Sequence, residues 1–128
     1  MMSYASYWTV MWEVEVTDEF LAWWRELNQD QQESLTDRID LLSERGPALG
    51  RPVVDRIHSS RHQNMKELRG SKDGVLPVLF AFDPRRTAIL LLGGDKTGQW
   101  NSWYRQAVPL ADDLYDQHLA DLSEEGLI

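Results

Sequence analysis

A chain of 128 residues, 42% of them hydrophobic, is long enough to bury one sizeable core, so we expect a single domain over residues 1–128, with residues 1–10 as a flexible extension. The absence of cysteine excludes disulfide bonds, thiolate nucleophiles and cysteine-ligated zinc. The sequence contains neither a long apolar run nor a basic, signal-like N-terminus, which argues against any membrane association and predicts a cytoplasmic protein.

The net charge of −8 is unevenly distributed along the chain. Residues 1–44 carry two basic and ten acidic side chains, residues 45–105 carry eleven basic and five acidic ones, and residues 106–128 carry six acidic and no basic ones. A cationic middle segment is compatible with an RNA site, because phosphate binding draws its affinity from lysine and arginine. It is equally compatible with acidic helices that pair with a basic sheet or with loops, so both interpretations stay open.

The N-terminal third predicts a strand followed by two helices. Apolar and acidic side chains alternate over residues 11–16, as in a strand with one solvated face. Thr17 follows as the cap of a first helix, in which four apolar side chains recur at helical spacing. Asp30, with Glu33 three residues later, fits the capping box of a second helix, and Gly46-Pro47 ends that helix.

The rest of the chain predicts three strands and a last helix. Residues 48–61 are rich in Gly, Pro, Ser and Arg, so we expect a loop that leads into a strand at about residues 62–69. Residues 75–82 and 87–92 are apolar on both parities, as in a hairpin of central strands, and an amphipathic helix should follow Pro109. The order of elements predicts an α+β fold, with an antiparallel or mixed sheet of about four strands and helices packed on one face.

Three segments of the chain resemble a known family. They are NMKELRG at residues 64–70, VLFAFDPRR at residues 78–86 and LLGGDKTGQWNSWY at residues 91–104. Together they resemble the RelE/HigB toxins of type II toxin–antitoxin systems, and the resemblance extends from about Trp12 to Tyr115. It implies a small RelE-like fold, in which the sheet packs against an N-terminal helical hairpin and a C-terminal helix completes the domain.

The resemblance also implies a function, namely a ribosome-dependent endoribonuclease that cleaves messenger RNA and inhibits translation. Its partner would be a helix-turn-helix antitoxin, which neutralises the toxin in a hetero-oligomer. Attack by an RNA 2′-hydroxyl on the adjacent phosphate needs a proton acceptor, a proton donor and cations, and no metal or cofactor is expected. Two alternatives stay open: a ParE-like toxin that acts on DNA gyrase, and an inactive module that only binds the antitoxin.

The family motifs supply candidate catalytic residues. Lys66, Arg69 and Lys96 match cationic positions of the family and could surround the phosphate, with Arg69 suited to bidentate contact. Tyr104 or His62 could transfer a proton or stack on a base, histidine because of its pKa of about 6.5 and tyrosine only if its pKa of about 10 is lowered. The other interpretation of residues 66–69 is a solvated edge strand, whose charges discourage aggregation.

Further residues are expected to bind RNA. Arg61 and Arg105 extend the set of cations, and His62 belongs to this group as well. Trp100 and Trp103 could stack on bases, although tryptophans three residues apart more often anchor a helix in the core. His62 also lies four residues from another histidine, but the basic surroundings argue against a metal site.

Three further positions qualify this interpretation. Pro77 stands where the resemblance would place an arginine, which predicts a cation-poor site with reduced or lost cleavage. Asp95 is expected to be a turn residue rather than a partner that orients Lys96. The acidic residues between 112 and 125 could fold across the cationic segment as a phosphate mimic, but an ordinary solvated helix face is favoured.

Overall fold

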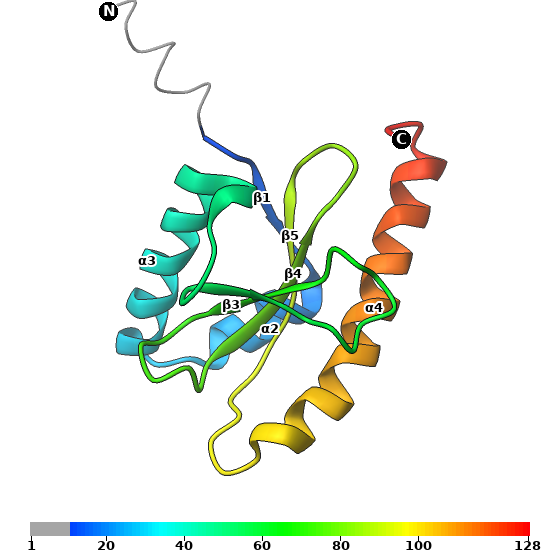
Figure 1. The fold of residues 1–128 in the computed structure, drawn as a ribbon. Helices are drawn as coiled ribbons and strands as arrows, with labels where there is room; N and C mark the ends of the chain where they lie inside the picture. Colours follow the sequence, from blue (N-terminus) through cyan, green and yellow to red (C-terminus); the bar gives the residue numbers. More distant parts are fainter. Residues whose placement is uncertain (1–10) are drawn as a thin grey trace, which may run out of the picture.

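The computed structural model describes residues 11–128, and its helices account for much of the chain (Figure 1). α2 (Asp18–Glu26) and α3 (Gln29–Arg45) follow one another closely, and the short 3-10 helix η1 (Gly46–Ala48) ends this part. The long α4 (Trp100–Glu124) lies near the C-terminus. None of the helices in this part of the chain combines the length and the apolar character needed to cross a membrane. The extension predicted for residues 1–10 lies outside the described residues.

The strands form one mixed sheet of five members in the order β1-β5-β4-β3-β2. Their bounds are Val14–Val16 for β1, Val54–Arg56 for β2, Lys66–Arg69 for β3, Pro77–Phe82 for β4 and Ala88–Gly93 for β5. β1 runs parallel to β5, and the other neighbours are antiparallel. The α+β class is therefore confirmed, with one strand more than the sequence predicted.

Helices cover both faces of this sheet. On one face, α2 and α3 pack against strand residues that include Leu68, Phe80 and Leu90. On the other face, α4 packs against Leu79 and Ile89 among others. The prediction that all helices lie on one face is wrong, because the two central strands are apolar on both parities and leave two surfaces to be buried.

The helix caps agree only in part with the sequence prediction. Thr17 caps α2, since its hydroxyl accepts a hydrogen bond from the Phe20 backbone N–H at 3.0 Å. The same hydroxyl donates to the Leu91 carbonyl at 2.7 Å and so connects the start of the helix to β5. The capping box of α3 is formed by Asn28 and Gln31, and its predicted position at residues 30 and 33 is wrong, because the helix already begins at residue 29.

Two elements differ from the prediction for physical reasons. β2 lies inside the expected loop; it is three residues long and forms only by pairing with β3. Pro109 lies inside α4 instead of before it. Val108 and Ala111 on either side of the proline are buried against the sheet, and this packing carries the helix past a residue that has no backbone N–H. Pro77 is the first residue of β4, a position at which a strand tolerates proline.

Candidate functional site

A buried polar cluster lies where β3, the loop after β5 and the start of α4 meet. The Tyr104 hydroxyl donates a hydrogen bond to Glu67 Oε2 and accepts one from Lys96 Nζ. The Lys96 ammonium also lies 3.5 Å from Glu67 Oε2. Because Glu67 and Lys96 are each only 5% exposed, the three side chains form a closed network, which we call the Glu67–Tyr104–Lys96 cluster.

Local structure places each member of this cluster. Glu67 follows the buried Met65 by two residues and therefore faces the same side of the sheet, toward α4. The backbone N–H of Lys96 donates to the Val75 carbonyl at 2.9 Å, which fixes the loop after β5. Asp95 accepts a hydrogen bond from the Thr97 N–H at 2.9 Å, the turn role predicted from the sequence.

The surroundings of Tyr104 keep its hydroxyl protonated. Burial raises the pKa of Tyr104 well above its ordinary value, and the hydrogen bond to the Glu67 carboxylate raises it further. The positive charge of Arg69 acts in the opposite direction on this pKa, but more weakly. The Tyr104 hydroxyl is therefore protonated at neutral pH, and the lowered pKa on which proton transfer by Tyr104 was expected to depend is not found, so a role as a phenolate base does not suit this site.

Aromatic rings cover the lysine of the cluster. The Lys96 ammonium lies 4.6 Å from the ring centroids of both Trp100 and Tyr104, a cation–π arrangement. Trp100 is 49% exposed, whereas Trp103 packs against the core on the α4 side. Trp103 thus anchors the helix in the core, whereas Trp100 remains in contact with solvent.

Tyr104 also reaches the surface. It lines a hollow of about 240 Å³, the Tyr104 groove, together with Ser59, Arg105, Val108 and Pro109. Arg105 is exposed and has no ion-pair partner within residues 11–128. The groove is therefore lined by the tyrosine of the cluster and by a guanidinium group, which can contact a phosphate.

Lys66 does not join this cluster. Strand alternation turns it to the opposite face from Glu67, and its ammonium lies 5.9 Å from the Phe82 ring centroid. Burial lowers the pKa of Lys66, and the nearby Arg56 lowers it further. The edge-strand interpretation of residues 66–69 is wrong, because β2 lies outside β3 and Glu67 is buried. The sequence did contain a sign that Glu67 is buried: it lies two residues after the apolar Met65 and so shares its side of the strand.

Arg61 and His62 form a separate cluster with carboxylates of α4. Arg61 pairs with Asp113 at 2.8 Å and also with Asp112 and Asp116, and His62 Nε2 lies 2.7 Å from Asp116 Oδ1. Asp116 follows Tyr104 by twelve residues, about 18 Å along the helix axis. Neither Arg61 nor His62 lines the Tyr104 groove, although Ser59, two residues before Arg61, does. Part of the acidic C-terminal segment holds these two residues, so that segment is more than a solvated face.

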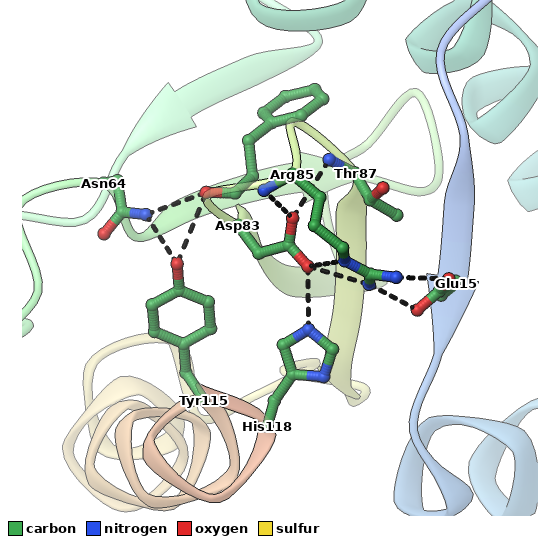
Figure 2. A network of polar contacts seen from close by, with 8 residues as sticks. Glu15, Asn64, Asp83, Arg85, Thr87, Tyr115 and His118 are labelled. Atoms are coloured by element: carbon green, nitrogen blue, oxygen red, sulfur yellow. Dashed lines mark hydrogen bonds and ion pairs between the residues drawn. The ribbon is translucent and has the colours of Figure 1, made fainter. Parts of the chain in front are cut away.

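A second buried network was not anticipated from the sequence. Figure 2 shows the Asp83 carboxylate between Arg85 of its own turn and His118 of α4. Arg85 extends the network to Glu15 beside it, at 2.8 Å. Asp83 is only 4% exposed, so these contacts fasten α4 and β1 to the turn between β4 and β5. Within the described part of the chain, no group of acidic, histidine or cysteine side chains is arranged to hold a metal ion.

The amino-acid sequence is similar to that of a protein family and of two named relatives. The family described as "Phage derived protein Gp49-like" matches residues 22–116. HigB3 of Mycobacterium tuberculosis, a protein named as a toxin, is 52% identical over 104 residues, which cover 81% of this chain and 89% of that protein. HigB2 of the same organism, also named as a toxin, is 42% identical over 118 residues, 91% of this chain but only 58% of HigB2.

A solved structure shares the fold. The archaeal RelE–RelB complex from Pyrococcus horikoshii contains a chain that superposes with a TM-score of 0.55 at 12% identity, over 70% of this chain and 98% of that chain. At this identity the likeness concerns the fold alone. Since the family match covers most of the chain and the sequence identity to HigB3 is high, the chain belongs to the Gp49-like family of HigB/RelE-type toxins of toxin–antitoxin systems.

Proposed function

We propose that this chain is a ribosome-dependent endoribonuclease that cleaves messenger RNA and is neutralised by an antitoxin. Kinship with HigB and RelE toxins supports the class of protein. The observation that carries the proposal is the Glu67–Tyr104–Lys96 cluster, whose Tyr104 also lines a groove together with Arg105.

The cluster suits the departure of the leaving group. In the cleavage step the RNA 2′-hydroxyl loses its proton to solvent water, its oxygen forms a bond to phosphorus, and the bond from phosphorus to the 5′-oxygen breaks. Tyr104 gives its proton to the leaving 5′-oxygen, and the adjacent Lys96 ammonium stabilises the phenolate that remains. Arg105 and Arg69 supply positive charge around the phosphate.

The charge supply is smaller than the family pattern would provide. Pro77 stands at the head of β4, at the position where the sequence resemblance places an arginine. Lys66 lies on the other face of the sheet, and the charge of Lys96 is partly neutralised by its ion pair with Glu67. We therefore propose slower cleavage than in relatives that carry the arginine.

Induction of the chain without an antitoxin, followed by mapping of messenger RNA 5′ ends, tests the proposal. The wild-type chain should stop growth and create new 5′ ends on translated messages. Tyr104→Phe removes the proposed proton donor and should lower cleavage by about 10²-fold or more, the usual contribution of general acid–base catalysis. Tyr115→Phe is the matched control: it removes the same atom from the same helix, but that hydroxyl contacts Asn64 and the Phe82 carbonyl instead.

Two outcomes would overturn the ribonuclease assignment, and a third would overturn only the role of Tyr104. DNA damage without new RNA ends would favour a gyrase target, and normal growth together with tight antitoxin binding would favour an inactive module. Equal cleavage by wild type and Tyr104→Phe would remove the assigned proton donor.

For the partner, we propose an antitoxin, supported by the RelE–RelB complex of the structural neighbour. Its proposed helix-turn-helix class is checked by co-purification and sequencing of the bound protein.

A further inference from the structure

A second concave site lies at the far end of β3. A pocket of about 300 Å³, which we call the basic pocket, is lined by Arg38, Pro52, Arg69, Ser71 and Lys72. These residues come from α3, from the segment before β2, from the end of β3 and from the turn after it. Three of the five are cationic, and no carboxylate lines the pocket.

Hydrogen bonds and close packing bring these segments together. On α3, the Ser34 hydroxyl donates to the Gly70 carbonyl at 2.7 Å, and Arg38 lies one helical turn further along the same face. A Cβ added to Gly70 would lie 2.7 Å from Leu35 Cδ1, so α3 approaches the chain closely at this point. The Arg69 N–H donates to the Val53 carbonyl at 2.8 Å, which places Arg69 beside Pro52.

The turn after β3 has a fixed shape as well. Asp73 Oδ1 accepts hydrogen bonds from the Ser71 hydroxyl at 2.6 Å and from the Val75 N–H at 3.2 Å. The hydrogen bond from Ser71 lowers the pKa of Asp73, and the bond from Val75 adds to this shift. Asp73, the acidic residue next to Lys72 in the sequence, is therefore engaged by hydrogen-bond donors of the turn itself.

The three cations of the basic pocket have no anionic partner. Arg38, Arg69 and Lys72 form no ion pair and no side-chain hydrogen bond with any part of the chain that the structure describes. Residues 1–10 contain no aspartate or glutamate that could supply one. Elsewhere in residues 11–128, Arg61, Arg85 and Lys96 are paired, whereas Lys66 and Arg105 stand singly. Three unpaired positive charges around one concavity repel one another, and a bound anion removes that repulsion.

We infer that the basic pocket is a second phosphate-binding subsite, which holds the backbone of the RNA away from the cleavage point. Two guanidinium groups and an ammonium match the oxygens of a phosphodiester. Arg69 connects the two sites, since it lines the basic pocket and its charge also acts on Tyr104. The identity of the ligand as RNA rests on the proposed function.

The test measures RNA binding by the purified full chain, separately from cleavage. The probe is a fluorescently labelled single-stranded RNA oligonucleotide, and its affinity is followed by anisotropy at several potassium chloride concentrations. The variant Arg38→Gln/Lys72→Gln removes two cations of the pocket and spares Arg69. Its matched control, Arg25→Gln/Arg45→Gln, removes two exposed cations from the last turns of α2 and α3 and has the same net charge.

The pocket variant should bind RNA about tenfold more weakly at low salt, and its slope of log affinity against log salt should be smaller by about 1.4, since each contact with single-stranded nucleic acid contributes about 0.7. The control pair should keep the wild-type slope, and Arg38→Lys/Lys72→Arg should restore it. Thermal unfolding of each variant confirms that it is folded.

Several results would overturn the inference. They are equal RNA affinity of the pocket variant and the control pair, no RNA binding by the wild-type chain at low salt, or an equal loss of affinity for poly-glutamate, which would assign the pocket to acidic polypeptides. Cleavage with unchanged binding would remove the subsite and leave the proposed function. RNA binding that depends on the pocket, without cleavage, would leave the subsite and remove the proposed function.

Discussion

Replacement of Asp83 by asparagine should destabilise the protein strongly, because one buried carboxylate joins three parts of the fold. Oδ2 of Asp83 accepts hydrogen bonds from Arg85 Nη2 at 2.8 Å, from Arg85 Nε at 3.0 Å and from His118 Nε2 at 2.9 Å. Oδ1 accepts the backbone N–H groups of Arg85 and Thr87. Asparagine keeps one oxygen but sets an amide donor or a neutral oxygen against two donor side chains.

The expected loss follows from these contacts. Removal of one partner from a buried charge pair costs about 3–5 kcal/mol. Arg85 retains Glu15 and is partly exposed, which places the Asp83→Asn variant near the lower end, at about 3 kcal/mol. For a domain of this size, that corresponds to a melting temperature lower by about 10 °C. Urea and thermal unfolding followed by circular dichroism measure both quantities.

The control is Asp113→Asn, which also removes an ion pair but from an exposed side chain. Asp113 pairs with Arg61, which keeps Asp112 and Asp116 as partners, so the expected loss is below about 0.5 kcal/mol. An Asp83→Asn variant within 1 kcal/mol of wild type, or equal to Asp113→Asn, would refute the reasoning.

The ionisation of Asp83 predicts that the effect of Asp83→Asn on stability depends on pH. Burial alone would raise the pKa of Asp83, but hydrogen bonds from His118 and Arg85 outweigh burial and hold this pKa below its ordinary value. A carboxyl group with a depressed pKa stabilises the folded state above its unfolded pKa of about 3.9, and the stabilisation is lost as the pH falls through the folded value. The difference between wild type and Asp83→Asn should therefore shrink as the pH falls below about pH 4.

Three other substitutions test separate features. Gly94→Ala places a Cβ 2.2 Å from Trp103 and should lower the free energy of unfolding by about 2 kcal/mol in urea titrations, whereas Gly50→Ala, with open space around it, should change little. Lys66→Met removes a half-buried, unpaired charge and should leave both stability and the messenger RNA cleavage pattern unchanged; lost cleavage would mean that Lys66 reaches the phosphate. Asp112→Asn weakens the hold on Ser60 and Arg61 and should speed hydrogen exchange of the loop over residues 58–64, at a cost of about 1–2 kcal/mol; unchanged exchange would contradict that role.

Local signals in the sequence were sufficient for most of the fold. The Thr17 cap and the two central strands were predictable because each depends on neighbouring residues or on burial parity. β2 was not, since three residues become a strand only when β3 is beside them. The start of α4 was misplaced because proline has a strong local preference, and burial of the surrounding helix outweighs it.

The candidate site was predictable only in its separate residues. Motifs pointed to Tyr104 and Lys96, and the structure joins them. Their partner Glu67 was interpreted as a surface charge, because burial depends on which strand lies at the edge of the sheet. Arg38 carries no motif; its place beside Arg69 results from the packing of α3 and could not be inferred without the tertiary structure.

The position of Thr17 means that two boundaries of the fold cannot vary independently. Its backbone N–H donates to the Leu90 carbonyl while its hydroxyl holds both Leu91 and the first turn of α2. Insertion of a single residue into β1 would break one of these attachments to preserve the other. Natural length changes in this protein should therefore accumulate elsewhere, since the passage from first strand to first helix behaves as one indivisible joint.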